Sequence, residues 1–121
     1  MTPLPDDALV VRGGQNLPVN FAQGAEVDIG EGGKLEGVSV NAGAGLSLRA
    51  LTAANPRTGY PGIPHSRVGV TTVGAVRAAG GDVIPAPTRA NPHHATLRGL
   101  TPEQASALFR PTVSNPSRRS D

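Results

Sequence analysis

The fold is decided by a stretch in the last third of the chain. It reads Asp82-Val-Ile-Pro85, Ala86-Pro-Thr-Arg-Ala-Asn-Pro92, His93-His-Ala-Thr-Leu97 and, after three more residues, Thr101-Pro-Glu-Gln104. Two short apolar runs separated by a proline-rich segment predict two strands joined by a stiff loop. Thr101 then caps a helix, with Pro102 at its first position and Gln104 placed to close a capping box. Strands beside a helix in so short a stretch favour an α+β domain.

Similar signals extend towards both ends of the chain. Short or alternating apolar runs predict further strands at residues 8–12, 25–29 and 37–41. Helices are expected at 46–51 and at 73–79, the second with Thr72 as its N-cap and glycines at its end. Residues 15–23 and 55–64 are expected to be loops. The last helix should bury Ala105, Leu108 and Phe109 and end near Pro111.

The composition is that of a folded chain with a thin core. The chain has 121 residues, with two Phe, one Tyr, no Trp, 16 Gly and 12 Pro, so the core must be mostly aliphatic. The spaced apolar runs argue against disorder. We therefore expect one small compact α+β domain over residues 1–112, with a short-stranded, mostly antiparallel sheet and two or three short helices. Residues 113–121 are expected to form a flexible tail.

Several classes of site are excluded or disfavoured. The chain has no cysteine, which rules out disulfides, thiolate zinc sites and a cysteine nucleophile. No apolar run approaches the roughly 20 residues of a membrane span, and the first residues lack the pattern of an ordinary signal peptide. We therefore expect no membrane association, and a protein that acts in the cytoplasm or is delivered into that of a target cell.

The charges are distributed unevenly along the chain. Residues 1–36 hold six acidic residues against one Arg and one Lys, whereas residues 37–121 hold nine Arg against three acidic residues. Arginine is well suited to bidentate contacts with phosphate. The basic part suits an anionic ligand such as a dinucleotide or RNA, or an acidic protein partner, and nine separately solvated arginines are the alternative.

Two positions early in the chain suit a phosphate-containing ligand. Arg12 ends the first expected strand, and the bare backbone of Gly13 after it allows a ligand to come close. Ser39 lies on the polar face of the strand at 37–41, where it can bind a ribose or a carboxamide. A surface arginine before a turn and an ordinary strand serine are the alternatives.

Two adjacent histidines near the end of the long loop are the strongest candidates for proton transfer. On a strand His93 and His94 must point to opposite faces, and His94 is preferred because Thr96 continues its face. Histidine changes its charge near neutral pH, which suits acid–base chemistry, although a structural role is equally compatible with the sequence. His65 lies in the other long loop and is a candidate for a mobile lid.

The motifs just described resemble, in their order, those of small bacterial toxins of the ADP-ribosyltransferase-like class. They are Leu9-Val-Val-Arg-Gly13, Gly37-Val-Ser-Val-Asn41, Asp82-Val-Ile-Pro85 and His94-Ala-Thr-Leu97. Type VI secretion effectors that act in the cytoplasm, and toxins of toxin–antitoxin pairs, are the nearest likenesses. The chain departs from the class in one respect: after Glu36 its only glutamate is Glu103, in the first turn of a helix, which is a poor match to the late catalytic glutamate of many members.

The resemblance implies a substrate, a set of site residues and a partner. NAD would be the substrate, with no metal, and the enzyme would be an ADP-ribosyltransferase or an NAD glycohydrolase. Arg12, Ser39 and His94 would be catalytic, and Gly13, Asn41 and Thr96 would join Arg12 and Ser39 in binding NAD. A cognate immunity protein or antitoxin would be the expected protein partner.

Two other functions are compatible with the sequence. One is a metal-independent ribonuclease toxin in which His93 or His94 acts on a ribose hydroxyl and Arg77, Arg89 or Arg98 steadies the phosphate. The shortage of aromatic residues counts against stacking on single-stranded RNA. The other is a non-enzymatic binding or structural domain.

Overall fold

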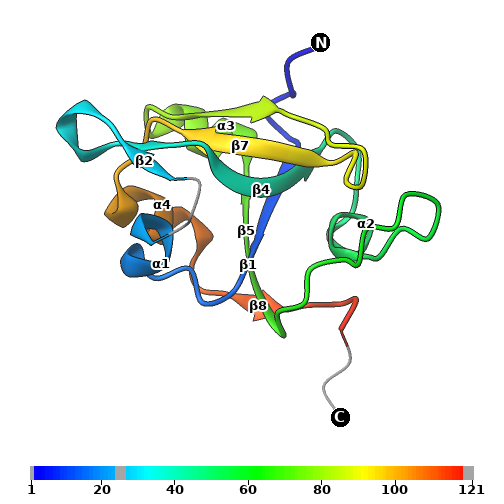
Figure 1. Ribbon diagram of the computed structural model, residues 1–121. Helices are drawn as coiled ribbons and strands as arrows, with labels where there is room; N and C mark the ends of the chain where they lie inside the picture. The colour runs from blue at the N-terminus through cyan, green and yellow to red at the C-terminus, as the bar shows by residue number, and fades with distance from the viewer. Residues whose placement is uncertain (1, 24–26, 119–121) are drawn as a thin grey trace.

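The computed structural model describes residues 2–23 and 27–118 and has an α+β fold, as the sequence predicts. Within these residues the strands are β1 (Leu9–Gly13), β2 (Asp28–Ile29), β3 (Leu35–Glu36), β4 (Val38–Gly43), β5 (Arg67–Thr72), β6 (Asp82–Pro85), β7 (His94–Arg98) and β8 (Val113–Ser114). The helices are α1 (Pro18–Ala22), α2 (Leu48–Thr52), α3 (Val73–Ala78) and α4 (Pro102–Phe109), with a 3₁₀ turn at Glu31–Gly33. Figure 1 shows their arrangement.

Six of these strands form one antiparallel sheet in the order β6–β7–β4–β1–β5–β8, and β2 and β3 form a separate hairpin. The sheet is nearly divided in the middle, because β1 and β4 pair only between Leu9–Val11 and Asn41–Gly43. The start of β4 pairs with β7 instead, and all of β1 pairs with β5. In Figure 1 the halves run in different directions, with β4 and β7 crossing the picture and β1 and β5 descending. The strands therefore separate on one side of this junction.

Two apolar clusters hold the sheet. The larger one lies against α1, α3 and α4, where the rings of Phe21 and Phe109 are 5.7 Å apart and both are fully buried. The smaller one packs α2 against β1 and β5 through Val11, Leu51 and Val68. Alternation along β4 places Val38 and Val40 in the larger cluster and leaves Ser39 exposed, as predicted.

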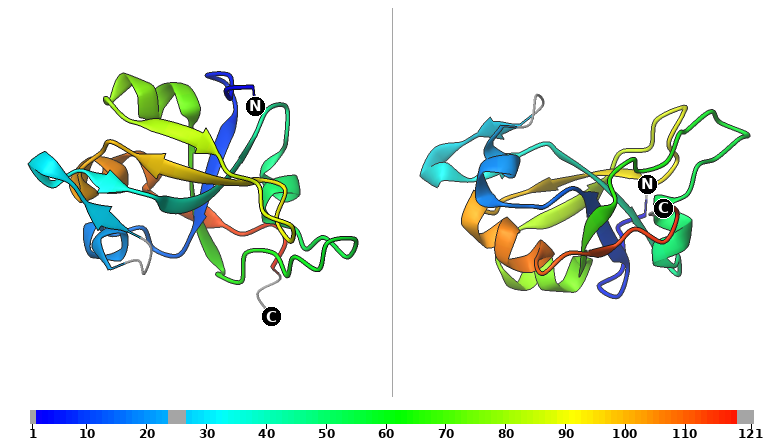
Figure 2. Two further views of the ribbon diagram at one scale, coloured as in Figure 1. Left: turned by 45° about the horizontal axis from the view of Figure 1, so that its top comes forward. Right: turned by 90° about the horizontal axis from the view of Figure 1, so that it is seen from below.

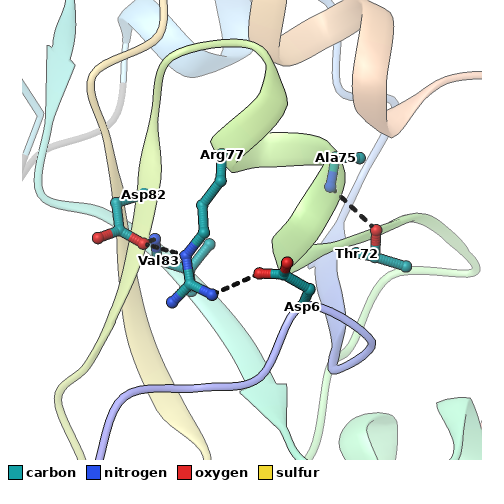
Figure 3. Close-up of polar contacts among 6 residues, drawn as sticks. All are labelled: Asp6, Thr72, Ala75, Arg77, Asp82 and Val83. Carbon is teal, nitrogen blue, oxygen red and sulfur yellow. Dashed lines mark hydrogen bonds and ion pairs between the residues drawn. The ribbon is translucent and has the colours of Figure 1, made fainter.

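The predicted helix caps are present. The Thr72 hydroxyl accepts a hydrogen bond from the Ala75 backbone N–H at 3.1 Å, as Figure 3 shows, and Thr101 and Gln104 form the reciprocal capping box at the start of α4. Figure 3 also shows Arg77, which donates to Asp6 at 2.7 Å and to Asp82 at 3.1 Å. These hydrogen bonds raise the pKa of Arg77 above its ordinary value. Arg77, in α3, thereby links the N-terminal segment at Asp6 to β6 at Asp82.

Two segments in the N-terminal part of the chain differ from the expectations. The expected loop at 15–23 contains α1, a helix of five residues in which Pro18 takes the first position and Asn20 accepts from the Leu17 N–H at 2.9 Å. So short a helix has too few positions to show a period, and the burial of Phe21 holds it in place. Of the strand expected at 25–29, residues 25 and 26 lie outside the described residues, and only Asp28 and Ile29 are in β2.

The C-terminal segment contains a short strand, which its polar composition does not predict. Val113 and Ser114, expected in a flexible tail, form β8 against Val68 and Arg67 of β5. Asn115 is 2% exposed. Residues 119–121 of the expected tail lie outside the described part of the chain.

Candidate functional site

A cleft of about 350 Å³ opens where β1 and β4 separate. Its walls come from β1, β4 and β7, from the α2–β5 loop (residues 53–66) and from the β6–β7 loop (residues 86–93). The lining residues are Val11, Arg12, Gly13, Ser39, Val40, Asn41, Tyr60, Ile63, Pro64, His65, Asn91 and His94. The two loops lie side by side in Figures 1 and 2. The split sheet thus provides the floor, and the loops provide the rim.

His94 and Ser39 form a hydrogen-bonded pair inside the cleft. His94 Nδ1 is 2.8 Å from the Ala86 carbonyl oxygen, and its Nε2 is 3.2 Å from Ser39 Oγ. A carbonyl oxygen can only accept, so Nδ1 carries a proton, and in the neutral ring Nε2 accepts from the Ser39 hydroxyl. His93 is outside the lining, and its backbone carbonyl accepts from the Ala42 N–H at 2.9 Å. The Ala86 carbonyl therefore fixes the orientation of the His94 ring, whose Nε2 faces Ser39.

Asn41 links both loops to the sheet. Its side-chain amide donates to the Leu51 carbonyl at 2.8 Å and to Tyr60 Oη at 2.9 Å, and its Oδ1 accepts from Asn91 Nδ2 at 2.8 Å. Both amide protons are therefore used within the protein, and the side chain is 6% exposed. Because Tyr60 Oη accepts from Asn41, its own proton is directed elsewhere. Asn41 acts here as the point at which the two loops are held together.

The α2–β5 loop crosses closely over Gly13. A Cβ at Gly13 would overlap the side chains of His65 and Ile63, so only glycine leaves room for the loop to lie there. Asn115 holds the same loop from behind, since its Nδ2 donates to the Ile63 and His65 carbonyls, both at 2.9 Å. The end of the described chain thereby supports one wall of the cleft.

Arg12 borders the cleft and a second hollow beside it. The second hollow measures about 430 Å³ and is lined by Arg12, Gly13, Gly14, Gln15, Asn20, Gln23 and His65. The Arg12 guanidinium lies 4.4 Å above the Phe21 ring and donates to Asn16 Oδ1 at 3.1 Å and to the Asn20 carbonyl at 3.3 Å. These bonds leave part of its five-donor fork free.

The electrostatic surroundings of Arg12 favour an anion. No carboxylate of residues 2–23 and 27–118 lies within ion-pair distance of this guanidinium. Burial lowers the pKa of Arg12 from its ordinary value, but a guanidinium keeps its proton at neutral pH. A half-buried positive charge held in place by neutral groups is a ready partner for a phosphate.

The cleft brings together most of the residues that the sequence singles out. Arg12, Gly13, Ser39, Asn41 and His94 all line it. Thr96 pairs with Ser39 in register, on the face that His94 shares, but outside the lining. The arginines considered for a ribonuclease are not there: Arg77 binds Asp6 and Asp82, Arg98 binds Glu36, and Arg89 is exposed on the β6–β7 loop.

Sequence reasoning missed four residues that shape the site: Tyr60, Ile63, Asn91 and Asn115. Tyr60 is the only tyrosine in the chain, and its isolation in a loop rich in proline and glycine was a usable signal. The two asparagines gave none, because asparagine is ordinary in loops.

No family model, curated protein or solved structure matches this chain. In the described part of the chain no three His, Asp or Glu side chains form a group that could hold a metal ion. No helix there is long and apolar enough to cross a membrane.

Proposed function

We propose that this protein is a bacterial toxin-like enzyme that binds NAD in the cleft and acts as an ADP-ribosyltransferase or NAD glycohydrolase. The observation that carries the proposal is that two neighbouring hollows border one half-buried arginine. The cleft and the second hollow share Arg12, Gly13 and His65. A dinucleotide would match this arrangement, because its two nucleosides could occupy the two hollows while its anionic diphosphate contacts Arg12.

The residues suggest how NAD would lie. Its diphosphate would contact the free donors of Arg12, beside His65, whose ring lies over Gly13. The nicotinamide riboside would enter the cleft beside Ser39, His94 and Tyr60. The adenosine would occupy the second hollow, where Gln15, Asn20 and Gln23 offer amides to a base and a ribose.

The first experiment is a binding measurement. Titration calorimetry with NAD should detect binding, and Arg12→Ala should weaken it by roughly 10- to 100-fold, the loss typical of a charge-assisted hydrogen bond. Arg110→Ala removes an exposed arginine after the end of α4 and serves as the matched control, with unchanged affinity. If NAD gives no heat and no nicotinamide appears during long incubation, the proposal is wrong.

The proposal also has a cellular side. A toxin that consumes NAD or modifies a cytoplasmic target would be paired with an immunity protein or antitoxin that occupies the cleft. Expression of the chain in bacterial cytoplasm should stop growth, and Arg12→Ala should relieve the arrest. Normal growth despite full-length accumulation of the protein would contradict this part of the proposal.

A ribonuclease is the second candidate, and one observation favours it. His65 and His94 line the same cleft as Arg12, and two histidines with a cation suffice for metal-independent RNA cleavage. The second histidine of this site is His65 rather than His93. Cleavage of RNA at low salt that is lost in both His65→Ala and His94→Ala would support it, and intact RNA after long incubation would exclude it.

A further inference from the structure

The lining of the cleft contains no aspartate or glutamate among the residues that the structure describes. The resemblance to ADP-ribosyltransferase-like toxins implies a late catalytic glutamate. Glu103, the late glutamate of the sequence, lies in the first turn of α4 and is outside the lining. The candidate bases that the lining does offer are the imidazoles of His65 and His94.

The Ser39–His94 pair has the geometry for this task. His94 Nδ1 donates to the Ala86 carbonyl, so Nε2 of the neutral ring is an acceptor, and it lies 3.2 Å from Ser39 Oγ. A hydroxyl bonded to a base whose tautomer is fixed by a third group is the arrangement of an activated nucleophile. Here a backbone carbonyl takes the place of the orienting carboxylate. Ser39 is exposed to the cleft, so a substrate carbon can reach its oxygen.

We propose that Ser39 attacks C1′ of the nicotinamide ribose and carries ADP-ribose as a covalent intermediate, with His94 as its base. This inference rests on the proposed NAD chemistry and goes beyond it. The bond from C1′ to the nicotinamide nitrogen breaks, and its electron pair neutralises the pyridinium. A bond from C1′ to Ser39 Oγ forms, and the hydroxyl proton moves to His94 Nε2.

The second step restores the enzyme. A water or an acceptor hydroxyl attacks C1′ and forms a new C–O bond. The bond between C1′ and Ser39 Oγ breaks, His94 returns its proton to Ser39, and the proton of the attacking hydroxyl is released to solvent. The net reaction is hydrolysis of NAD or transfer of ADP-ribose, without any cofactor. Two displacements at one carbon give overall retention of configuration.

The test is to trap the intermediate. The protein is incubated with a 2′-fluoro analogue of NAD, whose electron-withdrawing substituent slows the breakdown of a glycosyl adduct, and then quenched in acid. Intact mass spectrometry should show one added fluoro-ADP-ribosyl group per chain, and peptide fragmentation should place it on Ser39. Ser39→Ala should give no adduct, and His94→Ala should form it at least roughly 100-fold more slowly.

Controls separate this inference from the proposed function. Ser114→Ala removes an exposed hydroxyl on β8, at the edge of the sheet, and should form the adduct like the unaltered protein. Thermal unfolding verifies that each variant is folded, as expected for the exposed Ser39. If the protein releases nicotinamide from NAD but Ser39→Ala does so at the same rate, the covalent route is overturned while NAD cleavage stands. If NAD neither binds nor reacts, both proposals fail together.

Discussion

Replacement of Asn41 should lower the stability of the protein, because its side chain makes three hydrogen bonds that hold the cleft together. Asn41→Ala removes three hydrogen bonds and leaves the Leu51 carbonyl and the Asn91 amide without their partners in a buried place. At about 1 kcal/mol for each bond, the free energy of unfolding should fall by about 3 kcal/mol. Urea unfolding followed by circular dichroism measures the loss. Ser114→Ala, at an exposed site, should change the value by less than about 0.5 kcal/mol.

The Asn41→Asp variant tests the direction of these bonds. Its carboxylate would set an oxygen against the Leu51 carbonyl, where the amide of Asn41 now donates. Burial and this contact should raise the pKa of the introduced carboxyl in the folded state. The loss of stability should then be small below the unfolded pKa, near 3.9, and should grow as the pH rises through the folded pKa.

Two results would refute the account of Asn41. One is a loss below about 1 kcal/mol for Asn41→Ala, which would mean that the three bonds contribute little. The other is an Asn41→Asp variant whose deficit relative to the unaltered protein does not change with pH. Amide hydrogen exchange adds a local reading: both the 53–66 and the 86–93 loops should exchange faster in Asn41→Ala, because Asn41 holds both.

Three further predictions concern the core and the ligand. Phe109→Ala should lower the free energy of unfolding by roughly 3–5 kcal/mol, since the ring is fully buried against Phe21; a urea titration showing less than about 1 kcal/mol would contradict the packing. Gly13→Ala should push His65 and Ile63 out of place, at a cost of about 1–3 kcal/mol in unfolding, and should weaken NAD binding in calorimetry; unchanged affinity would mean that the loop position is unimportant. Arg12→Lys should not restore NAD affinity fully, because an ammonium cannot reproduce the guanidinium fork; full recovery in the same titration would show that charge alone suffices.

Much of the fold could be predicted from local signals. The caps at Thr72 and Thr101 depend on residues three positions apart, and the strands depend on alternation over four or five residues, so both are visible in the sequence. Helix α1 was missed because one turn has no period, and β8 because its pairing with β5 is set by residues more than 40 positions away.

The candidate site was predictable only in part, because it too depends on contacts between residues far apart in the sequence. Arg12, Ser39 and His94 stand out because they are charged or polar at defined positions on strands. That their strands meet in one cleft depends on the early end of the β1–β4 ladder, which alternation cannot reveal. Asn41, expected to contact the ligand, lines the cleft and also spends both amide protons on the protein itself, a structural role that alternation does not indicate.

Asn115 supports the wall of the cleft formed by residues 63–65, and this has a consequence for the order in which the site forms during synthesis. Every residue that lines the cleft precedes position 95, yet the wall over Gly13 is held by a side chain 20 residues further on. During synthesis from the N-terminus, the strands and both loops are made before the group that fixes one of them. The cleft therefore reaches its final shape only after Asn115 has left the ribosome, and a chain interrupted before Asn115 lacks this support for the 63–65 wall even if its sheet has formed.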